Sequence, residues 1–209
     1  MRKAAKLTII AAVSSLMLSG CQMTNDGAAA ARAAGGFAGV VAPPQVTRAA
    51  VAAPREVRFT AFVTGYSYWD NTPAGSAAIA RPVIHRRAGG TGTYDDPITL
   101  AVGHSIVGNR QTLDYPAGTR FYLAGLRKYA IVEDVCGDGA RPQNGPCHTG
   151  RDGRPWLDIY VDGSNSPRRA SDSCMSRLTR FHTIIQHPAP HYPVVAGPLT
   201  ESGCQVFSG

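Results

Sequence analysis

The 209-residue sequence has no apolar run long enough to cross a bilayer as a helix, which needs about 20 residues. It also has no basic run and no alternation of basic and aromatic residues, so nothing in it indicates nucleic-acid binding. The cysteines form no close Cys-x-x-Cys pair, which argues against a structural zinc site. We find no internal repeat and no cofactor motif, and therefore expect no cofactor.

The N-terminus has the order of a secretory signal. Arg2, Lys3 and Lys6 precede an uncharged apolar stretch over 7–18, and small residues follow. The Leu-Ser-Gly-Cys sequence that ends at Cys21 resembles the lipobox of bacterial lipoproteins. That resemblance implies a signal peptide over 1–20 and an exported chain held at a membrane by lipid on Cys21. The alternative is ordinary cleavage that leaves Cys21 as a free thiol.

Gln22 follows the cysteine, where an aspartate would have indicated retention at the inner membrane. By resemblance, this favours the outer membrane, with the protein facing the periplasm. Residues 21–55 are rich in alanine, glycine and proline and show no amphipathic period, so we interpret them as a flexible linker. Residues 56–209 then form one domain, long enough to bury a core, and we expect a monomer.

Charge is a weak guide to the partner. The formal net charge is +7, but removal of the signal would leave 18 basic against 14 acidic residues, a net charge of +4. A mild positive excess suits a polyanionic envelope.

Four cysteines remain if Cys21 carries lipid. An even number in an oxidising compartment predicts two disulfides, each contributing about 2–4 kcal/mol. Three pairings are possible, and the order along the chain favours Cys136–Cys147 and Cys174–Cys204.

Short runs of β-forming residues, separated by glycine and proline, dominate the domain. We expect strands at 58–64, 97–102 and 156–161, and a β-hairpin formed by 119–123 and 129–135. The helical spacing of Cys174, Leu178, Phe181 and Ile185 predicts a helix within 171–185. Many strands and little helix indicate an all-β barrel or sandwich.

Four segments, in order along the chain, resemble motifs of secreted double-psi β-barrel proteins. They are Gly-Gly-Thr-Gly-Thr-Tyr-Asp-Asp-Pro-Ile-Thr-Leu-Ala over 89–101, Pro-Ala-Gly-Thr-Arg over 116–120, the run 129–136 and Trp-Leu-Asp-Ile-Tyr-Val over 156–161. This superfamily contains rare lipoprotein A-like lytic transglycosylases, the 3D domains of membrane-bound transglycosylases, barwin-like endoglucanases and expansins. The resemblance implies a small six-stranded double-psi β-barrel with a loop-rich, disulfide-tied C-terminal extension that contains a short helix.

Asp158 is the first candidate for a catalytic role. Alternate residues of a strand share a face, so Leu157 and Ile159 should fill the barrel while Trp156, Asp158 and Tyr160 line an exposed groove. Aromatic rings can stack on sugars, and partial burial raises a carboxyl pKa toward the range of a general acid. The position of Asp158 also matches the catalytic aspartate of the transglycosylases it resembles. The alternative is a solvated or salt-bridged aspartate.

Two further residues could act with Asp158. His104 follows an Ala-rich strand, as a histidine does in rare lipoprotein A-like proteins, and could position a sugar or shuttle a proton. Asp134 matches the acid of the family's Asn-Asp-Arg-Gly-Pro motif, although the following residues differ here. A surface histidine and a structural aspartate are the respective alternatives.

The remaining candidates are binding residues. Tyr68 and Trp69, with Asp70 and nearby Tyr66, faintly resemble the Tyr-Trp-Asp of barwin-like endoglucanases and could line a glycan groove. Asp95 and Asp96 precede a proline and are expected to form a turn. Three histidines lie close together in the sequence but lack an acidic partner pattern, so we expect no metal there: His182, His187 and His191.

Three hypotheses of function follow from these residues. The first is an enzyme that cleaves an envelope glycan such as peptidoglycan, as a lytic transglycosylase or glycoside hydrolase would. The second is a glycan-binding or structural envelope barrel without turnover, as in expansin-like proteins. The third is a barrel that binds or inhibits a protein partner.

Overall fold

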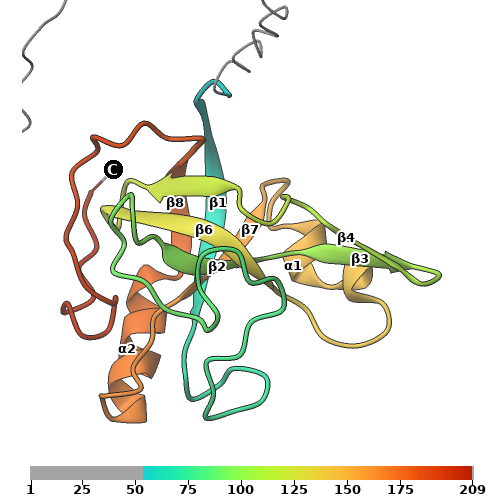
Figure 1. Ribbon diagram of the computed structural model, residues 1–209, viewed down its shortest axis with the longest axis horizontal. Helices are drawn as coiled ribbons and strands as arrows, with labels where there is room; N and C mark the ends of the chain where they lie inside the picture. Colours follow the sequence, from blue (N-terminus) through green and yellow to red (C-terminus); the bar gives the residue numbers. More distant parts are fainter. Residues whose placement is uncertain (1–53, 209) are drawn as a thin grey trace, which may run out of the picture. The chain divides into compact units, whose positions relative to one another are not determined.

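A closed six-stranded barrel forms the centre of the computed structural model, which describes residues 54–208 (Figure 1). The order around the barrel is β1-β7-β2-β6-β5-β8. Its strands are β1 (Val57–Tyr66), β2 (Ile98–Val102), β5 (Arg120–Leu123), β6 (Lys128–Val135), β7 (Trp156–Tyr160) and β8 (Arg180–Gln186). The all-β, six-stranded fold class is therefore confirmed, as are the strands at 58–64, 97–102 and 156–161. The predicted signal peptide, Cys21 and most of the predicted linker lie outside the described residues.

The barrel is built from both kinds of strand pair. β1 pairs with β7 and β2 pairs with β6 in parallel, whereas the other four pairings are antiparallel. The antiparallel pair of β5 and β6 is the hairpin predicted from the sequence. Full closure leaves the barrel without an open sheet edge that could pair with another chain.

Alternation along the strands fills the barrel interior. Leu157 and Ile159 are completely buried, as their positions in β7 predict. They pack with apolar side chains from every other barrel strand, including Val63, Leu100, Leu123, Val132 and Ile184. Each such side chain contributes roughly 1.5–3 kcal/mol when it is fully buried.

The prediction of a helix within 171–185 is wrong for its C-terminal half. The helix α2 spans Arg168–Leu178 and buries Cys174 and Leu178, as its spacing predicts. After Thr179 the chain becomes β8, whose Phe181 is 40% exposed while Ile184 and Ile185 are buried. β8 hydrogen-bonds to β1 and β5 and closes the barrel. That pairing decides the conformation, because residues 180–186 are rich in β formers and helical spacing alone does not distinguish the two states.

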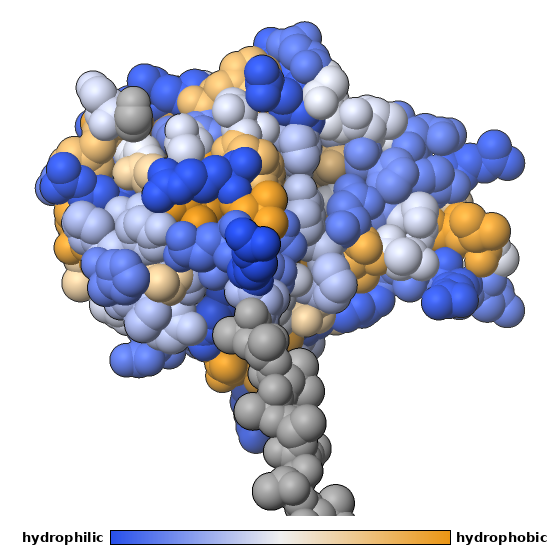
Figure 2. Space-filling view, turned by 90° about the horizontal axis from the view of Figure 1, so that it is seen from above, coloured by the Kyte–Doolittle hydropathy of each residue, from blue (hydrophilic) through white to orange (hydrophobic). Residues whose placement is uncertain are grey.

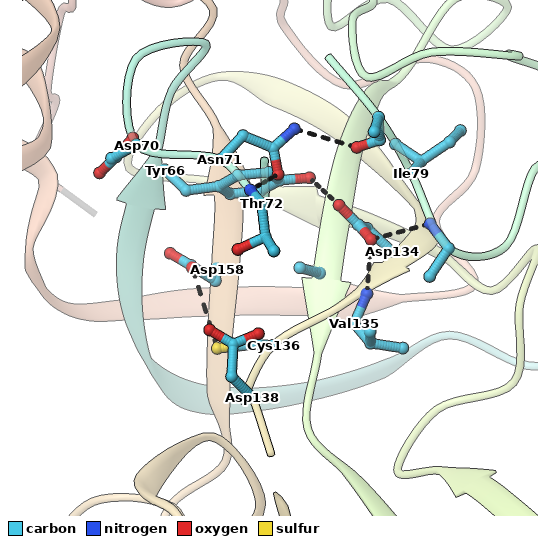
Figure 3. Close-up of a pocket in the computed structure, with 14 residues that line it drawn as sticks. Tyr66, Asp70, Asn71, Thr72, Ile79, Asp134, Val135, Cys136, Asp138 and Asp158 are labelled. Atoms are coloured by element: carbon cyan, nitrogen blue, oxygen red, sulfur yellow. Dashed lines mark hydrogen bonds between the residues drawn. The ribbon is translucent and has the colours of Figure 1, made fainter. Parts of the chain in front are cut away.

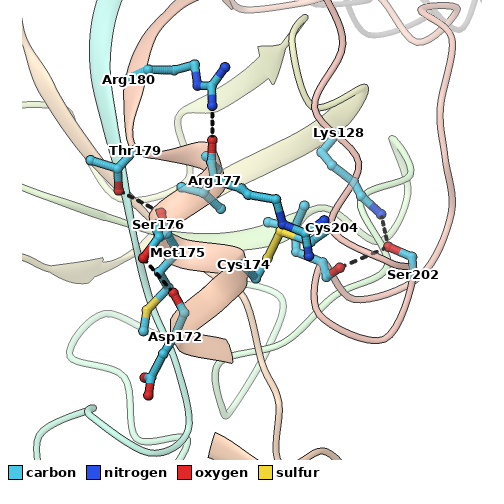
Figure 4. Close-up of a disulfide and its surroundings, with 12 residues drawn as sticks. Lys128, Asp172, Cys174, Met175, Ser176, Arg177, Thr179, Arg180, Ser202 and Cys204 are labelled. Carbon is cyan, nitrogen blue, oxygen red and sulfur yellow. Dashed lines mark hydrogen bonds between the residues drawn. A yellow bond between two sulfur atoms is a disulfide. The ribbon is translucent and has the colours of Figure 1, made fainter. Parts of the chain in front are cut away.

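The structure contains two disulfides, with the pairing favoured by the sequence. Cys136 at the end of β6 is bonded to Cys147, and Cys174 of α2 is bonded to Cys204 near the C-terminus. Figure 4 shows Cys174–Cys204 between α2 and the C-terminal extension. The prediction of a disulfide-tied extension is confirmed.

Lys128 provides a second attachment for the extension. Its side chain is buried, and its Nζ donates hydrogen bonds to the carbonyl oxygens of Val195 and Gly197. Nζ also lies 3.4 Å from Oγ of Ser202 (Figure 4). Burial lowers the pKa of Lys128 to about 8. No local sequence pattern indicates this buried lysine.

A hairpin arm extends from the barrel on the side of β7 (Figure 1). It consists of β3 (His104–Val107) and β4 (Arg110–Leu113). The short helices η1 (Pro142–Asn144) and α1 (Pro146–Thr149) pack beside it, and Gln143 hydrogen-bonds both backbone groups of Ile106.

The face in Figure 2 is mostly hydrophilic, with apolar residues in small separate groups. Scattered apolar residues of this kind are ordinary on a folded domain. Between residues 54 and 208, no helix is both long and apolar enough to span a membrane.

Candidate active site

A row of four aligned residues crosses four neighbouring barrel strands. Asp134 of β6 is level with Ala101 of β2, which is level with Asp158 of β7, which is level with Thr64 of β1. Adjacent strands lie about 4.8 Å apart, so the two aspartates are two strand spacings from each other. The small side chain of Ala101 between them leaves space above the row.

That space is a pocket of about 380 Å³, which we call the Asp158 pocket (Figure 3). Its walls include Tyr66 at the end of β1, the loop after β1, and residues 134–138. Four aspartates line it, and no lysine, arginine or histidine does: Asp70, Asp134, Asp138 and Asp158. The volume lies at the small end of the range for small-molecule sites. An acidic wall of this kind disfavours phosphate or other anionic ligands.

A directed chain of hydrogen bonds orients the Asp158 carboxyl. The indole Nε1 of Trp156 donates to Oγ of Thr64 at 2.8 Å, and Oγ of Thr64 donates to Oδ1 of Asp158 at 2.6 Å. An indole N–H can only donate, so the Thr64 hydroxyl is left to donate in turn. Oδ1 is therefore an acceptor, and a proton on this carboxyl belongs on Oδ2.

The second oxygen has no comparable donor within residues 54–208. Sγ of Cys136 lies 3.8 Å from Oδ2 of Asp158, but this sulfur is half of a disulfide and carries no proton to donate. Oδ2 is thus the oxygen that can exchange a proton with a bound molecule.

Burial raises the pKa of Asp158 from 3.8 to about 7. The hydrogen bond from Thr64 opposes this shift, whereas the charges of Asp70 and Asp134 add to it. Desolvation and like charges both disfavour the ionised form. At neutral pH, protonated and ionised Asp158 coexist, which is the condition that a general acid requires.

Asp134 is held more rigidly. Its Oδ1 accepts the backbone N–H groups of Ala80 and Val135, and its Oδ2 accepts the hydroxyl of Tyr66 at 2.9 Å. Burial raises its pKa, an effect that these hydrogen bonds oppose. Burial and the neighbouring Asp134 charge also hold the pKa of Tyr66 well above 10. Asp134 therefore fixes the wall of the pocket.

The Tyr68–Trp69–Asp70 segment forms a turn, and only its aspartate reaches the pocket. Oδ1 of Asp70 accepts both the backbone N–H of Ser67 at 2.7 Å and the Ser67 hydroxyl at 2.6 Å. Trp69 donates through Nε1 to the carbonyl oxygen of Gly163. Neither Tyr68 nor Trp69 lines the Asp158 pocket.

The expected common groove of Trp156, Asp158 and Tyr160 is not what the structure contains. Tyr160 is only 2% exposed, because it packs edge-on against Tyr66 and belongs to the buried apolar core. Trp156 contributes to a separate hollow rather than to the Asp158 pocket. Of the three residues, only Asp158 lines the pocket.

His104 lies near the pocket but not in its wall. It is 3% exposed, and its Nδ1 has no hydrogen-bond partner within residues 54–208. Burial lowers its pKa, although a hydrogen bond to the backbone of Cys136 opposes the shift. The imidazole is therefore placed behind the Cys136 segment rather than toward a ligand at Asp158.

None of the three clustered histidines lines the Asp158 pocket, and neither does Asp95 or Asp96. His182 bonds through Nε2 to the carbonyl oxygen of Leu178. Across residues 54–208, no group of three or more metal-binding side chains is arranged to hold an ion. Asp96 accepts the backbone N–H of Thr91 through both its carbonyl oxygen and Oδ2, as a turn residue does.

Sequence reasoning missed Thr64, Ala101 and Asp138 as members of the site. No local pattern marks the first two, because their role depends on strand register. Asp138 follows a broken family motif and gave no signal of its own.

Comparison with known proteins gives a family and no activity. No solved structure matches the chain. A Dictyostelium discoideum protein described as "Uncharacterized protein DDB_G0273701/DDB_G0273221" is 38% identical over 147 residues. The alignment covers 69% of this chain and 57% of that protein, so the chain spans little more than half of the relative's length. The profile described as "DDB_G0273701 N-terminal domain" matches residues 58–205, from β1 to beyond Cys204. The chain therefore belongs to the DDB_G0273701 N-terminal domain family.

Proposed function

We propose that the protein cleaves glycosidic bonds of a cell-envelope glycan such as peptidoglycan, by a lytic transglycosylase-like reaction with Asp158 as the general acid. The observation that carries this proposal is a carboxyl that lines a pocket, has its pKa raised to about 7 and has only Oδ1 engaged by a protein donor. A partly exposed carboxyl that keeps its proton near neutral pH is suited to protonating a leaving oxygen.

The walls of the pocket favour a polyhydroxylated ligand. Carboxylates and the side chains of Asn71 and Thr72 can exchange hydrogen bonds with sugar hydroxyls. The resemblance to double-psi barrel enzymes over the strand of Asp158 supports the same choice of substrate.

The reaction needs only one acid–base group. Asp158 transfers its Oδ2 proton to the glycosidic oxygen while the bond from the anomeric carbon to that oxygen breaks. The hydroxyl of the same sugar then attacks the anomeric carbon and returns its proton to Asp158. The products are a shortened glycan with a new hydroxyl and an anhydro-sugar end, and the acid is restored.

Hydrolysis would require a second carboxylate to activate water. Both oxygens of Asp134 already accept hydrogen bonds from the protein. This arrangement disfavours Asp134 as that second carboxylate and leaves Asp138 as the pocket aspartate that a hydrolytic route would need.

Glycan binding without turnover is the second candidate. The internal hydrogen bonds of Asp134 and Asp70 favour it, because they hold these two side chains of the pocket in place, as a binding site requires. Placement at the outer membrane through lipid on Cys21 is part of both versions. Mass spectrometry of the mature protein tests it: an unmodified Cys21 on a soluble product would contradict it.

The decisive experiment is digestion of purified peptidoglycan, with anhydro-sugar fragments measured by mass spectrometry. Asp158→Asn should lower their release by about 10²–10⁴-fold, the usual contribution of a general acid. Asp172→Asn is the matched control, because Asp172 is an exposed carboxylate on α2, outside the pocket.

Circular dichroism should show that both variants retain the fold. If wild-type protein releases no fragments from several glycans yet pellets with the sacculus, the binding function replaces the enzymatic one. Full activity of Asp158→Asn would exclude Asp158 as the acid.

A further inference from the structure

A second hollow lies beside the Asp158 pocket, on the other side of the Cys136–Cys147 disulfide. Its volume is about 410 Å³, and we call it the Trp156 hollow. The residues that contribute to it are Asp114 and Tyr115 after β4, His148 of α1, Arg154 in the loop before β7 and Trp156 at the start of β7. Cys136 lines the first cavity and Cys147 the second, so one disulfide forms part of both walls.

Two further links join the cavities. Trp156 and Asp158 are two residues apart on the same face of β7, a separation of about 7 Å. Both are hydrogen-bonded to Thr64. These links make the two cavities neighbours, and the separation of Trp156 and Asp158 along β7 suits successive units of a chain.

A histidine–aspartate pair is built into the Trp156 hollow. Nδ1 of His148 lies 2.6 Å from Oδ1 of Asp114, which leaves Nε2 as the ring nitrogen able to meet a ligand. Gly103 allows this close assembly, because a Cβ at that position would collide with the carbonyl oxygen of Cys147 and with the Asp114 carboxylate. Substitution of Gly103 would push the two residues apart.

The charges of the two cavities differ. The Asp158 pocket has four aspartates and no basic side chain in its wall. In the lining of the Trp156 hollow, the single acidic residue Asp114 is accompanied by the basic residue Arg154 and by His148. Within residues 54–208, Arg154 makes no salt bridge. A guanidinium is the protein group best shaped to bind a carboxylate through two hydrogen bonds.

We propose that the Trp156 hollow is a second subsite, which binds the sugar unit next to the one at Asp158 and prefers a unit that carries a carboxylate. This inference rests on the proposed glycan function. Arg154 binds the carboxylate, and Nε2 of His148 hydrogen-bonds to the same unit. Because Nε1 of Trp156 is engaged by Thr64, the indole contributes its ring surface to the contact rather than its N–H.

The test is calorimetric binding of two soluble probes of equal length to the Asp158→Asn protein, which cannot turn them over. One probe is a tetramer of N-acetylglucosamine, and the other is a tetrasaccharide in which N-acetylglucosamine alternates with glucuronic acid. We expect tighter binding of the acidic probe, and a smaller difference at high salt because exposed charges are screened.

Arg154→Gln should weaken binding of the acidic probe about tenfold, as the loss of a charge-assisted hydrogen bond predicts, and should leave the neutral probe unchanged. Arg169→Gln on α2 is the matched control, because it removes the same charge from an exposed position away from both cavities. His148→Ala should weaken binding of both probes.

The outcomes separate this inference from the enzymatic proposal. If Arg154→Gln behaves like Arg169→Gln, or if neither probe binds, the second subsite is wrong, whatever the peptidoglycan digest gives. If the acidic probe depends on Arg154 while wild-type protein cleaves no glycan, the subsite stands and the enzymatic proposal fails.

Discussion

Glu133 and Asp158 are carboxyls on barrel strands, the first completely buried and the second partly buried, and their pKa values move in opposite directions. Glu133, on β6, belongs to what we call the His85 cluster: His85, Asp96 and Glu133. Burial alone would raise the pKa of Glu133, but hydrogen bonds from His85 and the Ile84 N–H outweigh it and lower the pKa. For Asp158, burial prevails and the pKa rises to about 7.

The number of donors explains this difference better than the depth of burial. Oε1 of Glu133 accepts three consecutive backbone N–H groups, from Val83, Ile84 and His85, and Oε2 lies 2.7 Å from Nδ1 of His85. Asp158 has one strong donor, Thr64. A carboxylate surrounded by donors stays ionised and holds a loop in place, whereas one with few donors keeps its proton and can transfer it.

The sharpest test of this difference between Glu133 and Asp158 is to remove each carboxylate in turn. Glu133→Ala should lower the free energy of unfolding by about 3–5 kcal/mol, because three amide groups and a partly buried imidazole lose their completely buried acceptor. Asp158→Asn should keep the wild-type free energy or raise it at pH 8, because its site disfavours the ionised form. Urea unfolding of both variants at pH 8 measures the difference.

Equal losses of stability in Glu133→Ala and Asp158→Asn would contradict this account. Glu56→Ala is a suitable control, because Glu56 is an exposed carboxylate that also accepts a backbone N–H, from Ala189. Its effect should be much smaller than that of Glu133→Ala.

The pH dependence of stability should separate the two sites further. The pKa values of Glu133 and Asp96 are lowered in the folded state, so their contribution is present above about pH 4.5 and is lost as the pH falls through the folded values. Burial alone would lower the pKa of His85, but hydrogen bonds to Asp96 and Glu133 raise it above 6.5. Its contribution is therefore present below pH 6.5 and is lost as the pH rises through that folded value.

The raised pKa of Asp158 acts in the same direction as that of His85, since its ionisation between pH 3.8 and about 7 destabilises the folded state. The melting temperature, measured by thermal unfolding from pH 3 to 9, should pass through a maximum. This maximum should lie between the acid-side loss at Glu133 and Asp96 and the alkaline-side loss at His85 and Asp158. In Asp158→Asn the melting temperature should decline less on the alkaline side. An unchanged dependence of melting temperature on pH would argue against the raised pKa of Asp158.

The smallest expected effect concerns Thr64. Thr64→Val removes the donor that favours ionised Asp158, so the pKa of Asp158 should rise further. A general acid must be protonated, so the alkaline limb of the pH–rate profile for glycan cleavage should move to higher pH.

Thr60→Val is the matched control, because Thr60 is on the same strand but outside the row of aligned residues. It should leave the alkaline limb of the pH–rate profile unchanged. A shift toward lower pH in Thr64→Val would contradict the hydrogen-bond direction assigned here.

Local sequence patterns predicted much of the barrel. The alternation of Leu157 and Ile159 identified β7 and its buried face, and the run before Pro97 predicted the turn that Asp96 stabilises. The order of the four cysteines favoured the pairing that the structure contains. Each of these features depends on neighbours in the chain or on a small number of combinations, so the sequence carried enough information.

The sequence by itself therefore determined the all-β class, most strands and the candidate Asp158. Only the tertiary structure decided that residues 180–186 form the closing strand, that Tyr160 is buried, and that Trp156 belongs to a different cavity from Asp158. It also decided the row from Asp134 to Thr64 and the contact between His85 and Glu133. These depend on strand register and barrel closure, which bring together residues tens of positions apart, and no local pattern encodes such contacts.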